Sequence, residues 1–191
     1  MINIHKYSVF KDCETTLRET SKDDSEPNNI VYMTNDMRKV VDFDLVKTKY
    51  TNKLGLSEEV AKSVDALYDA KCKDIFIEFK NGKIKGKNAS IKEKVRTSLL
   101  LFYDITGKNA AYTRDNGEFV LVYNKEKNTD IERVKESSVQ KSTSREEIAG
   151  IVHKLAKEEF VRFGMDSFKG LFFGDVHTYT ETEFEQYLSE I

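Results

Sequence analysis

Residues 64–80 show a hydrophobic pattern that predicts two short strands joined by a polar turn at about residues 70–73. In the second strand, Glu78 and Lys80 are two positions apart, so they point to the same face of the sheet. Antiparallel pairing about this turn places Asp65 directly opposite Glu78. Two carboxylates in a direct cross-strand pair repel each other, so the pattern indicates a positive group, a lysine or a metal ion, beside them.

The rest of the chain alternates helical periodicity with short apolar runs. The spacing predicts helices over about 43–54, after Ser57, over about 88–107, from about 144 to 160 and over about 180–188. Strands are predicted at 119–123 and 170–178, with a strand or buried extension at 30–33 and a long loop over 124–142. The continuous apolar run at 119–123 is typical of a central parallel strand, which with the preceding strand and helix predicts a right-handed crossover.

These elements predict an α/β fold, with a central mixed β-sheet of four or more strands flanked by helices. We expect a single α/β domain over residues 1–191, in which residues 1–29 are partly irregular and 19–29 are the least ordered.

The composition is that of a globular chain, with 39% hydrophobic and 34% charged residues. No apolar run approaches the roughly 20 residues that span a bilayer, and the first six residues contain no apolar signal core. The two cysteines, Cys13 and Cys72, lie far apart in the sequence, which suits a reducing compartment. We therefore expect a cytoplasmic protein that does not associate with membranes.

The small net charge of −2 hides a strong segregation of charge along the chain. Residues 71–96 contain nine Lys or Arg against three acids, whereas the last eleven residues contain four Glu and no base. A basic strip beside a carboxylate pair favours a polyanionic partner such as nucleic acid. The alternative is that these lysines only solvate a surface hairpin and the start of a helix.

Asp65, the tripeptide Glu78-Phe79-Lys80, a helix from about Asn88 and the strand Phe119–Tyr123 resemble the core of the PD-(D/E)XK nuclease superfamily. The resemblance covers roughly residues 57–123 and implies a restriction-endonuclease-like core. Its implied activity is metal-dependent hydrolysis of phosphodiester bonds in nucleic acid. Members of this superfamily often have Pro before the Asp, where this chain has Val64.

The resemblance also implies the roles of individual residues. Asp65, Glu78 and the backbone carbonyl of Phe79 would hold the metal, and Asp65, Glu78 and Lys80 would be catalytic. An all-oxygen ligand set favours Mg²⁺, or Mn²⁺, over softer metals. Four further residues are candidates for auxiliary roles, two acids before the first strand and two residues on the following helix: Glu58, Glu59, Lys94 and Ser98.

Other interpretations remain open at the level of the sequence. Glu78 and Lys80 would be solvent-facing in an edge strand, although the apolar Phe76 on the same face favours burial. Two alternative functions are compatible with the same fold. The chain would be a non-catalytic protein that binds a protein partner through its C-terminal third, or a nucleic-acid-binding module without cleavage. Asp175 and His177 share a strand face, which fits a hydrogen-bonded histidine or a metal or acid–base pair.

Overall fold

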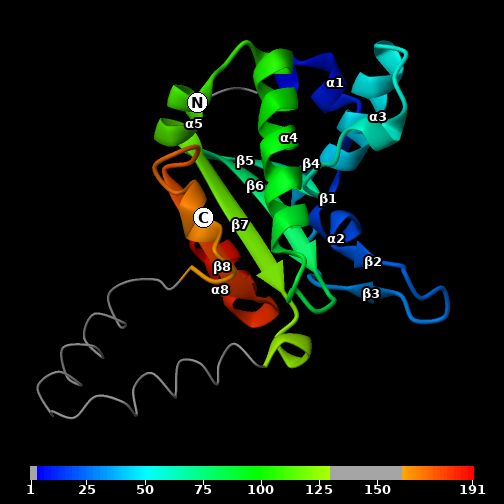
Figure 1. Cartoon of the computed structure of the whole chain (residues 1–191), viewed down its shortest axis with the longest axis vertical. Helices are drawn as coiled ribbons and strands as arrows, with labels where there is room; N and C mark the ends of the chain where they lie inside the picture. Colours follow the sequence, from blue (N-terminus) through cyan, green and yellow to red (C-terminus); the bar gives the residue numbers. More distant parts are fainter. Residues whose placement is uncertain (1–3, 130–160) are drawn as a thin grey trace, which may run out of the picture.

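The computed structural model describes residues 4–129 and 161–191. A six-stranded mixed sheet with the order β1-β4-β5-β6-β7-β8 forms its centre (Figure 1). Its strands are β1 (Glu14–Thr16), β4 (Lys39–Asp42), β5 (Ala66–Ala70), β6 (Lys73–Lys80), β7 (Gly117–Tyr123) and β8 (Asp175–Thr180). A small second sheet pairs β2 (Lys22–Asp23) with β3 (Val31–Tyr32). The predicted α/β class with a mixed sheet of four or more strands is confirmed.

The sheet is antiparallel from β1 to β6 and parallel from β6 to β8. In the β5–β6 hairpin Ala66 pairs with Ile77 and Ala70 pairs with Lys73, which confirms the predicted turn. The amide of Asp65 donates a hydrogen bond to the carbonyl of Ile77 at 3.0 Å, so Asp65 begins the pairing opposite Glu78. β7 lies between two parallel neighbours, as its continuous apolar run predicts.

Helices precede, connect and follow these strands. They are η1 (Ile4–Lys6), α1 (Ser8–Lys11), α2 (Leu17–Thr20), α3 (Phe43–Lys53), η2 (Glu58–Val60), α4 (Asn88–Thr106), α5 (Ala110–Asn116), η3 (Glu126–Asn128), η4 (Met165–Phe168) and α8 (Glu181–Glu190). The predicted helices at 43–54, 88–107 and 180–188 are confirmed, and the short helix after Ser57 is the 3₁₀ turn η2. Thr180 and Glu183 form the capping box that begins α8. The predicted helix at 144–160 lies outside the described residues.

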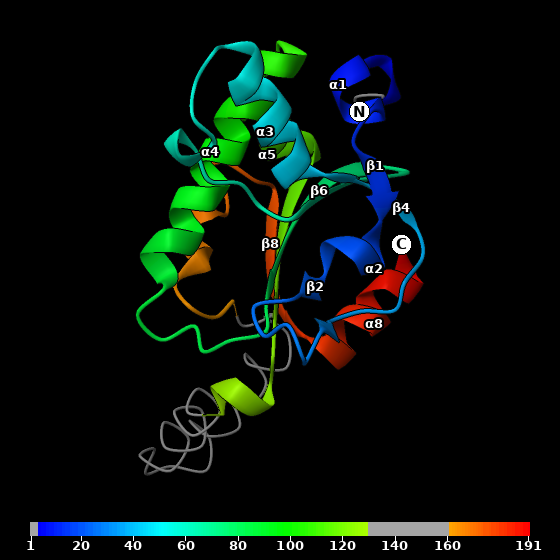
Figure 2. The ribbon, with the colours of Figure 1, turned by 90° about the vertical axis from the view of Figure 1, so that its right-hand side faces the viewer.

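Each face of the sheet carries its own hydrophobic core. Helices lie on both sides of the sheet (Figure 2). One face packs against α1, α3, α4 and η4, and its central residues include Phe76, Phe102 and Phe119. The other face is covered by α2 and α8, with Ile77, Phe79 and Phe184 at its centre. Because side chains alternate along β6, Phe76, Glu78 and Lys80 all point toward the α4 side.

Three boundaries differ from the prediction. The strand predicted at 170–178 begins only at Asp175, because Gly170 adopts a left-handed conformation with φ of 72° and residues 170–174 form a turn. The segment 19–29 is partly ordered, since it includes the end of α2 and strand β2. The predicted loop after residue 124 starts with η3, and its remainder from 130 onward lies outside the described residues.

Asp74 makes the stability of this fold depend on pH. Its side chain is fully buried at the start of β6, where burial raises its pKa to about 6 despite a hydrogen bond from the Tyr112 hydroxyl at 2.7 Å. The folded pKa lies above the ordinary value of 3.8, so the folded state gains stability as the pH falls from about 7 to about 4. We expect this gain to be roughly 2–3 kcal/mol.

Urea unfolding of wild type and Asp74→Asn at pH 8 and pH 5 measures this contribution. The variant should lose a large part of the wild-type gain in stability between these two pH values. Equal gains in the two proteins would contradict the prediction. Acid residues elsewhere, including Asp65, titrate in both proteins, so the difference between them isolates Asp74.

Candidate functional site

A cleft of about 520 Å³ opens at one end of the central strands, where β4 and β6 end and β5 begins. Asp65, Phe79 and Lys80 line it from the hairpin, and the opposite wall comes from residues 19–25. Six carboxylates and three lysines line this cleft, so its surface is acidic on balance: Glu19, Asp23, Asp24, Asp42, Asp44 and Asp65, with Lys22, Lys80 and Lys87. An acidic cleft of this kind attracts cations.

Asp65, which lines the cleft, and Glu78, which is buried, share one ammonium group. Lys94, from the first half of α4, places its Nζ 3.2 Å from Asp65 Oδ1 and 3.0 Å from Glu78 Oε2. The same nitrogen is 2.9 Å from Glu78 Oε1. The structure therefore brings the predicted carboxylate pair together and adds Lys94 as a bridge between the two groups.

Lys80 supplies the second positive charge. Its Nζ is 2.7 Å from Glu78 Oε1, and the Glu78 side chain is completely buried. Although Oε1 is close to both ammonium groups, it accepts no hydrogen bond of acceptable geometry from the described residues. The alternative that Glu78 faces solvent on an edge strand is wrong, because β6 is central and Glu78 is inaccessible.

The electrostatics of Asp65 reflect this crowding. Burial and then the neighbouring charge of Glu78 raise the pKa of Asp65 to about 7, although Lys94 and the amide of Phe79 oppose the shift. The amide of Phe79 donates to Asp65 Oδ2 at 2.6 Å. Since Lys80 and Lys94 supply two positive charges beside these two acids, burial is the main cause of the raised pKa.

The backbone of β6 directs the carbonyl of Phe79 to the same place. The amide and carbonyl of one strand residue point toward the same neighbouring strand. Since the Phe79 amide bonds to Asp65, its carbonyl also points toward the β5 side, just beyond the start of that strand. The next carbonyl, that of Lys80, points to the other side and accepts from Asn124 at 3.0 Å. The Phe79 carbonyl thus faces the same side of β6 as Asp65.

The four auxiliary candidates have different positions. Lys94 contacts both carboxylates, as described above. The buried Ser98 hydroxyl accepts from the amide of Val64 at 2.9 Å and so fixes the backbone immediately before Asp65. Glu58 and Glu59 are exposed in η2 and do not line the cleft. A role for Ser98 is therefore one of positioning.

Asp42 and Asp44 are acids of the cleft that the sequence pattern does not single out. Asp42 ends β4 and caps α3 by accepting from the amide of Leu45 at 2.8 Å, and burial raises its pKa. Asp44, in the first turn of α3, accepts a hydrogen bond from the Ser63 hydroxyl. The only signal in the sequence is an acid at the start of a predicted helix, which ordinary capping also explains.

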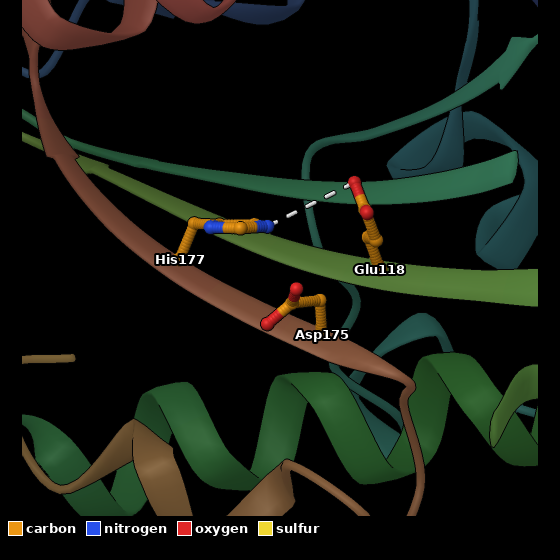
Figure 3. Close-up of side chains that lie close together, drawn as sticks. All are labelled: Glu118, Asp175 and His177. Atoms are coloured by element: carbon orange, nitrogen blue, oxygen red, sulfur yellow. Dashed lines mark ion pairs between the residues drawn. The ribbon is translucent and has the colours of Figure 1, made fainter. Parts of the chain in front are cut away.

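A second cluster of polar residues, Glu118, Asp175 and His177, lies where β7 and β8 begin (Figure 3). Ligand atoms of Glu118, Asp175 and His177 lie within 4.8 Å of one another. Glu118 also contacts the ammonium of Lys73 and accepts from the Tyr187 hydroxyl at 2.6 Å. Burial would raise the pKa of Glu118, but hydrogen bonds from His177, Lys73 and Tyr187 outweigh it and lower the pKa to about 2.

This second cluster already contains its own counter-ions. Lys169 Nζ lies 2.7 Å from Asp175 Oδ1, in addition to the Lys73 contact with Glu118. His177 Nδ1 is 3.0 Å from the Tyr179 hydroxyl, which agrees with the interpretation of a hydrogen-bonded strand histidine. Through these contacts the cluster joins the start of β6 with β7, β8 and α8.

The basic strip of residues 71–96 does not form one surface. Lys73 pairs with Glu118 at one end of the hairpin, whereas Lys94 is bound at the other end by Asp65 and Glu78. Lys92 Nζ donates to the Ser167 hydroxyl at 3.1 Å. Only Lys80 and Lys87 of this strip line the cleft.

Comparisons with protein-family models, curated proteins and solved structures find no match for this chain. Among residues 4–129 and 161–191, no helix is long and apolar enough to cross a membrane.

Proposed function

We propose that this chain is a metal-dependent nuclease with a restriction-endonuclease-like core. The observation that carries the proposal is the carboxylate pair of Asp65 and the buried Glu78 beside Lys80, next to an acidic cleft that Asp65, Phe79 and Lys80 line. The order of elements supports it, because the antiparallel β5–β6 hairpin is followed by α4 and the parallel strand β7.

The residues of the site fit a hard divalent cation. Their donors are all oxygens, which Mg²⁺ and Mn²⁺ prefer. Glu78 Oε1 is buried between the ammonium groups of Lys80 at 2.7 Å and Lys94 at 2.9 Å, so a cation that binds this oxygen would take the place of an ammonium. Asp42 and Asp44 add negative charge at the same cleft. Asp65, Glu78 and the Phe79 carbonyl would hold the ion.

Hydrolysis of a phosphodiester needs an activated water and stabilisation of the charge that develops on the phosphate oxygens. A divalent cation at this site would lower the pKa of a bound water and neutralise negative charge on the phosphate. Lys80 borders the cleft and would stabilise the developing negative charge through its ammonium group. Asp65 and Glu78 orient both lysines, and Ser98 holds the chain that presents Asp65.

Two measurements on wild type and Asp65→Asn test this function. Calorimetric titration with Mg²⁺ and Mn²⁺ should show binding to wild type and at least about tenfold weaker binding to the variant, since one charged ligand is lost. Incubation with single- and double-stranded DNA and RNA should give metal-dependent cleavage by wild type and none by Asp65→Asn. Glu59→Gln removes an exposed acid outside the cleft and should behave as wild type in both assays.

The outcomes separate the proposed function from its alternatives. Metal binding with no cleavage of any of these nucleic acids would contradict a nuclease and favour the protein-interaction role. Salt-sensitive nucleic-acid binding without cleavage would favour a binding module. Equal metal affinity in wild type and Asp65→Asn would remove the metal site.

A further inference from the structure

Lys94 occupies the position that a cation would take between Asp65 and Glu78. Its nitrogen is within 3.2 Å of three carboxylate oxygens, two from Glu78 and one from Asp65. A single ammonium between two acids partly neutralises them, as a bridging metal ion would. It is therefore in direct competition with any cation that needs the same oxygens.

The Lys94 side chain is not completely enclosed. Its side chain remains 19% exposed, whereas that of Glu78 is fully buried. Asp44 lies at the cleft, retains 54% exposure of its side chain, and contributes to the electrostatic environment of Lys94. A flexible four-carbon stem carries the ammonium, so its movement requires no change in the α4 backbone.

We propose that Lys94 is a displaceable internal counter-ion, which holds the two carboxylates together without metal and must be moved aside when a divalent cation binds. This inference rests on the proposed metal site and concerns its regulation. Lys94 is a positioning residue here, because it acts through Asp65 and Glu78. Its displacement weakens the apparent metal affinity by the free energy needed to break its two ion pairs.

The arrangement has two measurable consequences. Without Lys94, the carboxylate pair lacks part of its compensation, so the metal-free protein becomes less stable. The same loss removes the competitor, so Mg²⁺ binds more tightly and stabilises the protein more strongly. A merely structural salt bridge predicts the first consequence but not the second.

The experiment compares wild type, Lys94→Met and Lys94→Gln by thermal unfolding and by calorimetric titration with Mg²⁺. Lys94→Gln retains a hydrogen-bond donor and serves as the second variant where Lys94→Met fails to fold. Lys92→Met is the matched control, because it removes a lysine from the same helix whose nitrogen contacts Ser167 and neither carboxylate. Without metal, we expect both Lys94 variants to melt at a lower temperature than wild type, and Lys92→Met to melt at the wild-type temperature.

With Mg²⁺, we expect at least about tenfold tighter binding by the Lys94 variants than by wild type. Their melting temperatures should also rise by more than that of wild type at the same Mg²⁺ concentration. Equal or weaker affinity in both Lys94 variants would overturn the inference, as would absence of binding in every protein. Neither readout uses cleavage, so tighter binding by variants of a protein that cleaves nothing would support the inference while the nuclease function fails.

Discussion

Replacement of Lys80 with Met should lower the rate of metal-dependent cleavage by about 10²–10³-fold, which is the typical cost of removing one charge-stabilising group. Met preserves most of the length and apolar stem of Lys but removes its ammonium. Lys80 contacts Glu78 Oε1 at 2.7 Å and lines the cleft, so its charge lies where a phosphate would approach. Single-turnover cleavage of the preferred nucleic acid at saturating Mg²⁺ measures the effect.

Metal affinity distinguishes a catalytic Lys80 from one that only maintains the site. Loss of Lys80 leaves Asp65 and Glu78 in place and removes one ammonium beside Glu78 Oε1, so Mg²⁺ affinity should not fall below that of wild type. Lys87→Met is the control, since Lys87 also lines the cleft without a described contact to either carboxylate. A cleavage rate equal to wild type in Lys80→Met would contradict the assignment, and so would an equal loss in Lys87→Met.

The core of the candidate site is predictable from sequence because it depends on local geometry. Asp65, Glu78 and Lys80 lie on one hairpin, and the two-residue period of a strand together with the turn fixes which of them share a face. The apolar residues Phe76 and Phe79 identify β6 as a buried strand. Burial of Glu78 follows from that position, as the structure confirms.

The rest of the site is non-local and left a weak signal in the sequence. Asp42 and Asp44 reach the cleft only because β4 pairs with β5, a pairing that brings together residues about 25 positions apart. Lys94 is on the predicted helix, but its role as a bridge depends on how α4 packs over β6. The helical period alone identifies its face and not its contacts.

The second cluster shows the same limit. The alternation of strand residues places Asp175 and His177 on one face, yet their neighbour Glu118 comes from β7. Its proximity follows from the parallel register in which Glu118 pairs with Asp175. No local pattern encodes that register, because the two residues are separated by a long connection.

Replacement of Phe76 with Ala should lower the free energy of unfolding by about 3–5 kcal/mol, the usual cost of removing a fully buried Phe. Phe76 is inaccessible to solvent at the centre of the α4-side core. Its ring lies 5.2 Å from that of Phe102 and 5.4 Å from that of Phe173, with both pairs edge-to-face. Urea unfolding at constant pH measures the loss.

Phe76→Leu provides the control, because it keeps an apolar side chain and should lose clearly less stability than Phe76→Ala. Phe76 lies two residues before Glu78 on the same face of β6, so the strand that anchors this core also presents the candidate site. Phe76→Leu should therefore retain Mg²⁺ binding. A loss below about 1.5 kcal/mol in Phe76→Ala would show that this face of β6 is not packed as the core requires.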